Sequence, residues 1–252
     1  MLKTRVIPTL LWKDPGLVKG VAFDSWRRVG TVLPAIRVYN LRDVDEIIIV
    51  DITATGEQRR PDVESVRDFS QDCFVPLTVG GGIGSLEDIR ELLRAGADKV
   101  SLNSALFERP ELIASAAEHF GTQCIVASLD CRRLQGRTLC FSHSGTRNTE
   151  REVVEVARQA QQLGAGEILL TSIERDGTME GYDLELVRQV AEAVDIPVIA
   201  SGGAGKLEHF VEAVQAGASA VAAASLYHFT ETTPDEVKRT LHSSGVPVRL
   251  GL

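Results

Sequence analysis

Short apolar runs alternate with amphipathic segments along the whole chain. Eight runs are largely apolar without strict alternation, a pattern that is typical of strands buried on both faces of a parallel sheet. The predicted strands are residues 5–11, 46–53, 76–81, 99–104, 125–130, 167–173, 197–203 and 220–225.

Amphipathic helices are predicted between these runs. In residues 85–96, Leu86, Ile89 and Leu92 fall on one stripe, Ser85 is a candidate N-cap, and Gly96 ends the segment. Similar patterns cover residues 110–121, 149–166, 183–194 and 206–217. Eight strands each followed by a helix predict one α/β domain over residues 1–252, a (β/α)8 TIM barrel, with an open doubly wound sheet as the alternative.

The chain also repeats itself at a constant offset of 121 residues. Gly81 and Gly82 pair in this way with Gly202 and Gly203, and Ser104 pairs with Ser225. We therefore predict two half-barrels, about 1–122 and 123–252, that face each other across the barrel axis.

The repeated glycine turns predict two phosphate sites. Glycine lets the backbone approach a ligand closely, and the free N–H groups at the start of the following helix favour an anion. The first predicted site is Gly81, Gly82, Asn103 and Ser104, and the second is Gly202, Gly203, Ala224 and Ser225, with Gly177 nearby. Two facing sites would suit a substrate with a phosphate at each end, whereas the alternative is that the glycines only make tight turns.

Composition limits the possible partners. The formal charge of −8 argues against nucleic-acid binding, and no apolar run reaches the roughly 18 residues of a membrane helix. The four cysteines lack metal-ligand spacing, so we expect reduced thiols, no metal and no cofactor. The first residues do not resemble a signal peptide, which predicts a cytoplasmic protein.

Five stretches resemble the cyclase subunit of imidazole glycerol phosphate synthase: residues 50–56, 78–83, 96–105, 164–183 and 199–210. The resemblance covers essentially the whole chain. It implies a heterodimer with a glutaminase subunit, whose ammonia passes along the barrel interior to a phosphorylated substrate at the opposite end.

The resemblance also assigns roles to individual residues. Asp130 matches a catalytic aspartate, and Asp51, Asp176 and Ser201 match positions that line the active face. Lys19 matches a lysine of a mobile flap in the loop after the first strand, where Phe23 would stack on a ligand ring. A charged ring that gates ammonia is matched by Arg5, Glu46, Lys99 and Glu167. Each of these four begins a strand, where opposite charges would neutralise one another, so a purely stabilising cluster is the alternative.

One position departs from the family. The partner of Asp130 in the first half is Leu11, where the family has a second catalytic aspartate. Leucine cannot transfer a proton, and loss of an acid–base partner typically lowers the rate by ~10²–10⁴. Asp14, three residues further on, is the alternative carboxylate.

About forty residues of the chain resemble instead a paralogous branch of the family, in the apolar Leu11, the flap sequence of residues 12–19 and the run of residues 43–49 before the second strand. That branch serves acetamidino-sugar formation in surface (lipo)polysaccharide synthesis together with a separate sugar amidotransferase. The leading hypothesis is thus an ammonia-using subunit of a two-component glutamine amidotransferase in that branch. Three alternatives stay open at this point: an authentic histidine-pathway cyclase forming imidazole glycerol phosphate, a non-catalytic glutaminase activator and ammonia conduit, and the related sugar isomerase barrel.

Overall fold

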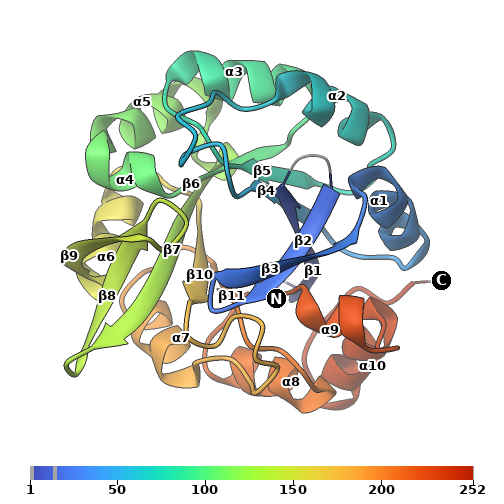
Figure 1. Cartoon of the computed structure of the whole chain (residues 1–252). Helices are drawn as coiled ribbons and strands as arrows, with labels where there is room; N and C mark the ends of the chain where they lie inside the picture. The colour runs from blue at the N-terminus through green and yellow to red at the C-terminus, as the bar shows by residue number, and fades with distance from the viewer. Residues whose placement is uncertain (1–2, 14–15, 252) are drawn as a thin grey trace.

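The computed structural model describes residues 3–13 and 16–251, and these form a closed barrel of eight parallel strands (Figure 1). Each strand pairs with the next in the chain's order, and pairing of β12 with β1 closes the circle. The strands are β1 (Arg5–Lys13), β4 (Ile47–Asp51), β5 (Leu77–Gly80), β6 (Lys99–Leu102), β7 (Ile125–Leu134), β10 (Glu167–Ser172), β11 (Val198–Ser201) and β12 (Ala220–Ala223). All eight predicted strands and the barrel are confirmed.

Helices surround the strands on the outside. They are α1 (Val32–Leu41), α2 (Val63–Gln71), α3 (Leu86–Arg94), α4 (Ser104–Glu108), α5 (Pro110–Phe120), α6 (Val153–Gln162), α7 (Leu184–Ala191), α8 (Leu207–Gln215), α9 (Ser225–Phe229) and α10 (Pro234–Ser243), with a 3-10 turn at Thr122–Cys124. Ser85 caps α3 as predicted, because its side chain accepts the N–H of Asp88, and Gly96 takes the positive φ of 109° that ends the segment.

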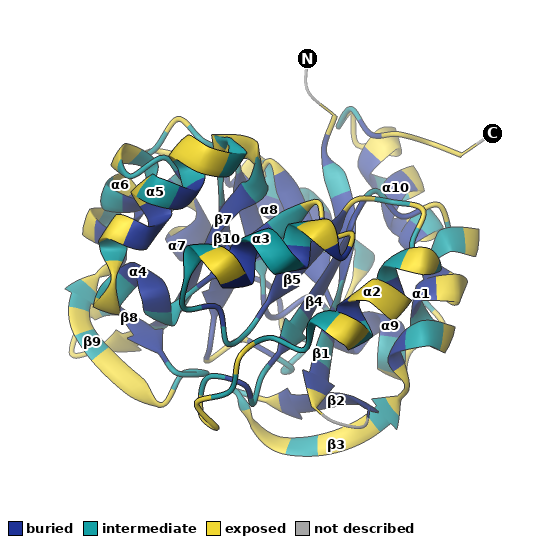
Figure 2. Ribbon diagram, turned by 90° about the horizontal axis from the view of Figure 1, so that it is seen from above, coloured by how far each residue is buried: buried dark blue, intermediate teal, exposed yellow. Residues whose placement is uncertain are grey.

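The core has two parts because strand side chains alternate between the barrel interior and the helices. Ile7, Ile48, Val126, Leu169 and Ile199 are among the residues that pack inside the barrel. The residues between them in sequence pack outward against the helices, in a larger cluster. Figure 2 shows this layering, with buried strands inside and exposed residues on the outer helix faces.

Two β-hairpins extend the barrel, and the hydrophobic pattern did not predict them. β2 (Gly16–Val21) and β3 (Asp24–Gly30) follow β1, whereas β8 (Arg137–Ser142) and β9 (Arg147–Glu152) follow β7. β1 and β7 are the first strands of the two predicted half-barrels. The prediction of a helix over residues 149–166 was wrong at its start, because residues 149–152 belong to β9 and the helix begins at Val153.

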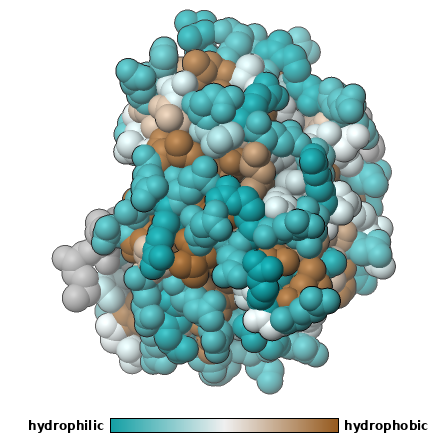
Figure 3. Space-filling model, turned by 90° about the vertical axis from the view of Figure 1, so that its left-hand side faces the viewer, coloured by the Kyte–Doolittle hydropathy of each residue, from teal (hydrophilic) through white to brown (hydrophobic). Residues whose placement is uncertain are grey.

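The two ends of the barrel differ in what covers them. We call the end where the strands begin the base and the end where they finish the mouth. The β2–β3 hairpin lies over the mouth, and both chain termini lie on the opposite side (Figures 1 and 2). The flank that carries β8 and β9 is mostly hydrophilic, with hydrophobic side chains in small separate areas (Figure 3). Among residues 3–13 and 16–251, no helix has both the length and the apolar character needed to cross a bilayer.

Candidate functional site

A deep pocket opens at the mouth, where the strand ends and the loops after them converge. It contains about 1160 Å³ of space, counted out to the solvent. Most site residues predicted from the sequence line it, including both glycine turns, Asp51, Asp130, Asp176 and Ser201. The fold therefore brings together groups from both halves of the chain that lie far apart in sequence.

The two predicted phosphate sites form loops on either side of this pocket. Gly81 and Gly82 have φ of 106° and 71°, and Gly202 and Gly203 have φ of 84° and 113°. A side chain at Gly203 would also collide with the carbonyl oxygen of Gly181. Glycine is thus required at these turns both for conformation and for space. We call the site with Gly81 and Gly82 the first cradle and the site with Gly202 and Gly203 the second cradle.

The residues after the turns make different contacts in the two cradles. Asn103 donates its side-chain amide to the carbonyls of Ser128 (3.0 Å) and Phe141 (3.1 Å) and lies 3.3 Å from Asp130. Ser104 accepts the N–H of His143 at 3.1 Å. In the second cradle, the hydroxyl of Ser225 is buried without a hydrogen-bond partner among the described residues.

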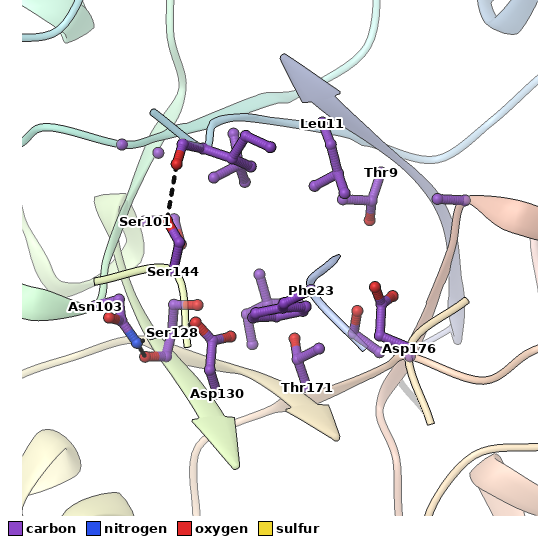
Figure 4. Close-up of a pocket in the computed structure, with 18 of the residues that line it drawn as sticks. Thr9, Leu11, Phe23, Ser101, Asn103, Ser128, Asp130, Ser144, Thr171 and Asp176 are labelled. Atoms are coloured by element: carbon purple, nitrogen blue, oxygen red, sulfur yellow. Dashed lines mark hydrogen bonds between the residues drawn. The ribbon is translucent and has the colours of Figure 1, made fainter. Parts of the chain in front are cut away.

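Asp130 and Leu11 lie on opposite sides of the opening, with Phe23 between them (Figure 4). Burial raises the pKa of Asp130 to about 7, and the nearby carboxylate of Asp176 acts in the same direction. A carboxyl group with this pKa can give or accept a proton near neutral pH. Leu11 offers no second titratable group on its side of the pocket.

The other two predicted aspartates are already engaged with cations. Asp51 accepts the backbone N–H groups of Thr53 and Ala54 and pairs with Arg59 at 3.0 Å. Asp176 pairs with Lys19 at 2.6 Å, and the Lys19 side chain is only 1% exposed. These contacts make Asp51 and Asp176 well-suited to hold the mouth loops in place, and they leave Asp130 as the carboxyl group best placed for proton transfer.

The predicted flap is a hairpin rather than a loop, so the sequence-based placement of Lys19 was wrong. Lys19 lies within β2, and Phe23 lies in the turn between β2 and β3. The backbone N–H of Ala22 donates to the carbonyl of Asp176 at 2.8 Å, which fastens the hairpin to the loop after β10. Gly177 lies under this contact, against the backbone of Gly20. Asp14, the alternative carboxylate, lies outside the described residues.

The predicted charged ring forms at the base. Arg5 contacts Glu46 at 2.6 Å and Glu167 at 2.8 Å, while Lys99 contacts both glutamates at 2.9 Å. Thr78 donates a further hydrogen bond to Glu46 at 2.6 Å. Burial opposes the charge of Arg5, but Glu167 and Glu46 more than compensate, and the pKa of Arg5 lies above its ordinary value. The four charges thus close a circle in which each group contacts two of opposite sign.

Sequence reasoning missed a set of hydroxyl groups between the base and the mouth. The pocket is lined at this level by Thr9, Ser101, Ser128, Thr171 and Ser201, of which only Ser201 was predicted. The sequence did contain a signal for these residues. Side chains alternate along a strand, and each of these residues is separated by an even number of positions from another inward-facing residue of its strand. Ser144 was also missed; its hydroxyl donates to the carbonyl of Ile52 at 2.8 Å (Figure 4).

The chain matches a known protein family. A family model described as "Histidine biosynthesis protein" matches residues 5–233, which include the charged ring, the two cradles and both mouth hairpins.

The raised pKa of Asp130 predicts a pH dependence of stability that Asp130→Asn removes. Between about pH 4 and pH 7 the unfolded chain ionises Asp130 while the folded chain keeps it protonated, so this group's stabilising contribution falls as pH rises. We expect the difference in unfolding free energy between native chain and variant to change by at most about 1.4 kcal/mol per pH unit. Urea unfolding at pH 5 and pH 8 measures it, with exposed Asp68→Asn as the control. Equal pH profiles for the native chain and Asp130→Asn would contradict the assignment.

Proposed function

The chain belongs to the family of histidine biosynthesis proteins, and we propose that it is the ammonia-using barrel subunit of a two-component glutamine amidotransferase. The observation that carries this proposal is the closed ring of Arg5, Glu46, Lys99 and Glu167 at the base. The base of such a barrel ordinarily serves stability alone. Burying four ionisable groups around the barrel axis carries a desolvation cost that an apolar base would avoid, and a role in admitting ammonia would explain why they stand there.

The interior of the barrel suits ammonia in its neutral form. Directly above the ring lies the apolar cluster that includes Ile7, Leu169 and Ile199. A charged ammonium ion loses its hydration in such surroundings, whereas NH3 loses far less, so the apolar layer selects the nucleophilic form. The hydroxyl groups of Thr9, Ser101 and the other residues at their level then offer hydrogen bonds before the mouth.

The mouth supports a reaction other than imidazole ring closure. Ring closure in this family uses two aspartates, and the position opposite Asp130 is Leu11. We therefore place the chain in the branch that supplies ammonia for acetamidino-sugar formation in surface polysaccharide synthesis, with a separate sugar amidotransferase as a further partner. Asp130 remains available for proton transfer at the mouth. An alternative form of this proposal is that the barrel catalyses no reaction itself and only activates the glutaminase and conducts its ammonia.

The base also offers a surface for the glutaminase. Leu41 at the end of α1 is 88% exposed and Phe74 before β5 is 81% exposed. The two belong to neighbouring segments, because the backbone N–H of Phe74 donates to the side chain of Asn40, the residue before Leu41. Two large exposed apolar side chains at the same end of the barrel as the ring are typical anchors of a protein interface.

The first prediction concerns the histidine pathway. In a histidine auxotroph that lacks its cyclase subunit, we expect the native chain, co-expressed with its glutaminase, not to restore growth without histidine. Loss of the acid–base partner lowers the rate of ring closure by a factor of ~10²–10⁴. An authentic cyclase subunit expressed at the same level is the control. Growth with the native chain would favour the histidine-pathway cyclase over this proposal.

The second prediction concerns the docking face. Phe74→Asp should weaken the complex with the glutaminase at least ~30-fold, because an interface anchor typically contributes about 2 kcal/mol or more. Leu134→Asp, at another partly exposed apolar residue at the end of β7, is the matched control. Sedimentation or calorimetric titration of the two chains measures the effect. Equal affinities of Phe74→Asp and Leu134→Asp for the glutaminase would contradict an interface at the base.

A further inference from the structure

We propose that Cys131 and Cys140 form an oxidisable pair, which hydrogen peroxide converts to an intramolecular disulfide across β7 and β8 beside the mouth pocket. All four cysteines are free thiols in the structure, and the fold brings these two together. The pair is a modification site that goes beyond the proposed function and does not depend on it.

The two sulfur atoms lie in contact. The Sγ atoms of Cys131 and Cys140 are 3.9 Å apart, and the two residues stand directly opposite one another in the antiparallel pairing of β7 with β8. No other two thiols in residues 3–13 and 16–251 make such a contact. The pair is therefore distinct from Cys73 and Cys124, which are single thiols.

The register of the strands allows a disulfide at this position. β7 and β8 are joined by the two-residue turn 135–136, so Leu134 and Arg137 form the first pair of the ladder and the cysteines form the fourth. Hydrogen-bonded and non-hydrogen-bonded pairs alternate, and a two-residue turn is flanked by a hydrogen-bonded one. The cysteines thus form a non-hydrogen-bonded pair, with Cα atoms about 4.5 Å apart. Disulfides join Cα atoms separated by about 4.4–6.8 Å, so the bond can form with the strands in place.

Packing alone does not require cysteine here, as the internal repeat shows. The residue after Leu11, Trp12, is the twin of Cys131. Trp12 pairs with Leu17 in the hairpin that follows β1, and both are buried. In the first half of the chain, an ordinary apolar pair therefore fills the place that two thiols fill in the second half.

The oxidation balances with one molecule of hydrogen peroxide. The thiolate of one cysteine attacks a peroxide oxygen, which breaks the O–O bond, releases one water after protonation and leaves a sulfenic acid. The second thiol attacks the sulfenic sulfur, forms the S–S bond and releases a second water. The two thiols thereby lose two electrons and two protons, and the peroxide is reduced to two molecules of water.

Burial makes the first step slow and directs the second. Cys131 is 1% exposed and Cys140 is 0% exposed. Burial, followed by the contact with Cys140, raises the pKa of the Cys131 thiol well above its ordinary value. The thiolate fraction is therefore small near neutral pH, and a small oxidant has the better access. Once one sulfur is oxidised, the other already touches it, so disulfide formation precedes attack by a second peroxide.

The disulfide would fix one wall of the mouth pocket. Cys131 directly follows Asp130, which lines the pocket. Cys140 directly precedes Phe141, which pairs with Asp130 across the ladder. Phe141 also belongs to the small apolar cluster against which Phe23 of the flap packs. Oxidation would thus link the strand that carries the titratable carboxyl group to the strand that supports the flap.

The test is treatment of the folded full chain, carrying Cys73→Ser and Cys124→Ser, with hydrogen peroxide. The peroxide concentration is one that oxidises both remaining thiols of the urea-unfolded chain. Free thiols are then blocked in denaturant, and peptides are analysed by mass spectrometry. We expect a disulfide between Cys131 and Cys140 within one chain, which dithiothreitol reduces. The matched control adds Cys140→Ala and should form no disulfide within the chain.

Thermal unfolding and amide hydrogen exchange measure the effect on the hairpin. The oxidised chain should unfold at a midpoint roughly 5 °C or more above that of the reduced chain, because the link restricts the unfolded state. Amide exchange in β8 should slow, and reduction should reverse both changes. Two reduced thiols after treatment, sulfinic acids in place of the disulfide, a disulfide between chains, or an unchanged midpoint would each overturn the inference. The experiment contains no glutaminase and no ammonia, so its failure would leave the proposed function untouched.

Discussion

The ring of ion pairs at the base is the interaction on which the rest of the structure depends. Arg5, Lys99 and Glu167 each begin a strand and Glu46 directly precedes one, and each of the four charges contacts two of opposite sign. Glu46 is almost fully buried, so removing one cation from the ring would leave its carboxylate with a single cationic partner. Removing both cations would leave it unpaired in the interior, at a cost of about 3–5 kcal/mol. The alternation of strand side chains then fixes the order of the layers above the ring: an apolar layer, a hydroxyl layer and the mouth.

The two halves of the chain differ at two places around the mouth pocket. The halves agree in their glycine turns and in the hairpins after β1 and β7. They differ where Leu11 lies opposite Asp130, so that only the second half has a carboxyl group at this position. They differ again in the acceptors of two hairpin N–H groups, since that of His143 donates to the Ser104 hydroxyl and that of Ala22 donates to the carbonyl of Asp176. The pocket therefore has two unlike sides, although the glycine turns repeat in the sequence.

The sequence predicted the parts of this molecule that local pattern determines. The eight strands, the Ser85 cap and the four residues of the ring follow from periodicity, spacing and family resemblance. The hairpins were not predicted because β3 and β9 are largely exposed and polar, so their sequences show no alternation of hydrophobic and polar residues. The Gln135–Gly136 pair, with φ of 50° and 79°, was the one usable signal, since such turns join hairpin strands. The pairing of Lys19 with Asp176, 157 residues away, and the unmatched hydroxyl of Ser225 depend on tertiary contacts that no local pattern encodes.

Isotope labelling can trace nitrogen through the ring. The chain assembled with its glutaminase would be given amide-15N glutamine and an excess of unlabelled ammonium chloride, and the amidated product would be analysed by mass spectrometry. We expect the native chain to give product labelled almost entirely from glutamine, and Lys99→Ala, which opens the ring, to give product diluted by external ammonium. Equal dilution in the native chain and in Lys99→Ala would contradict passage of ammonia through the base.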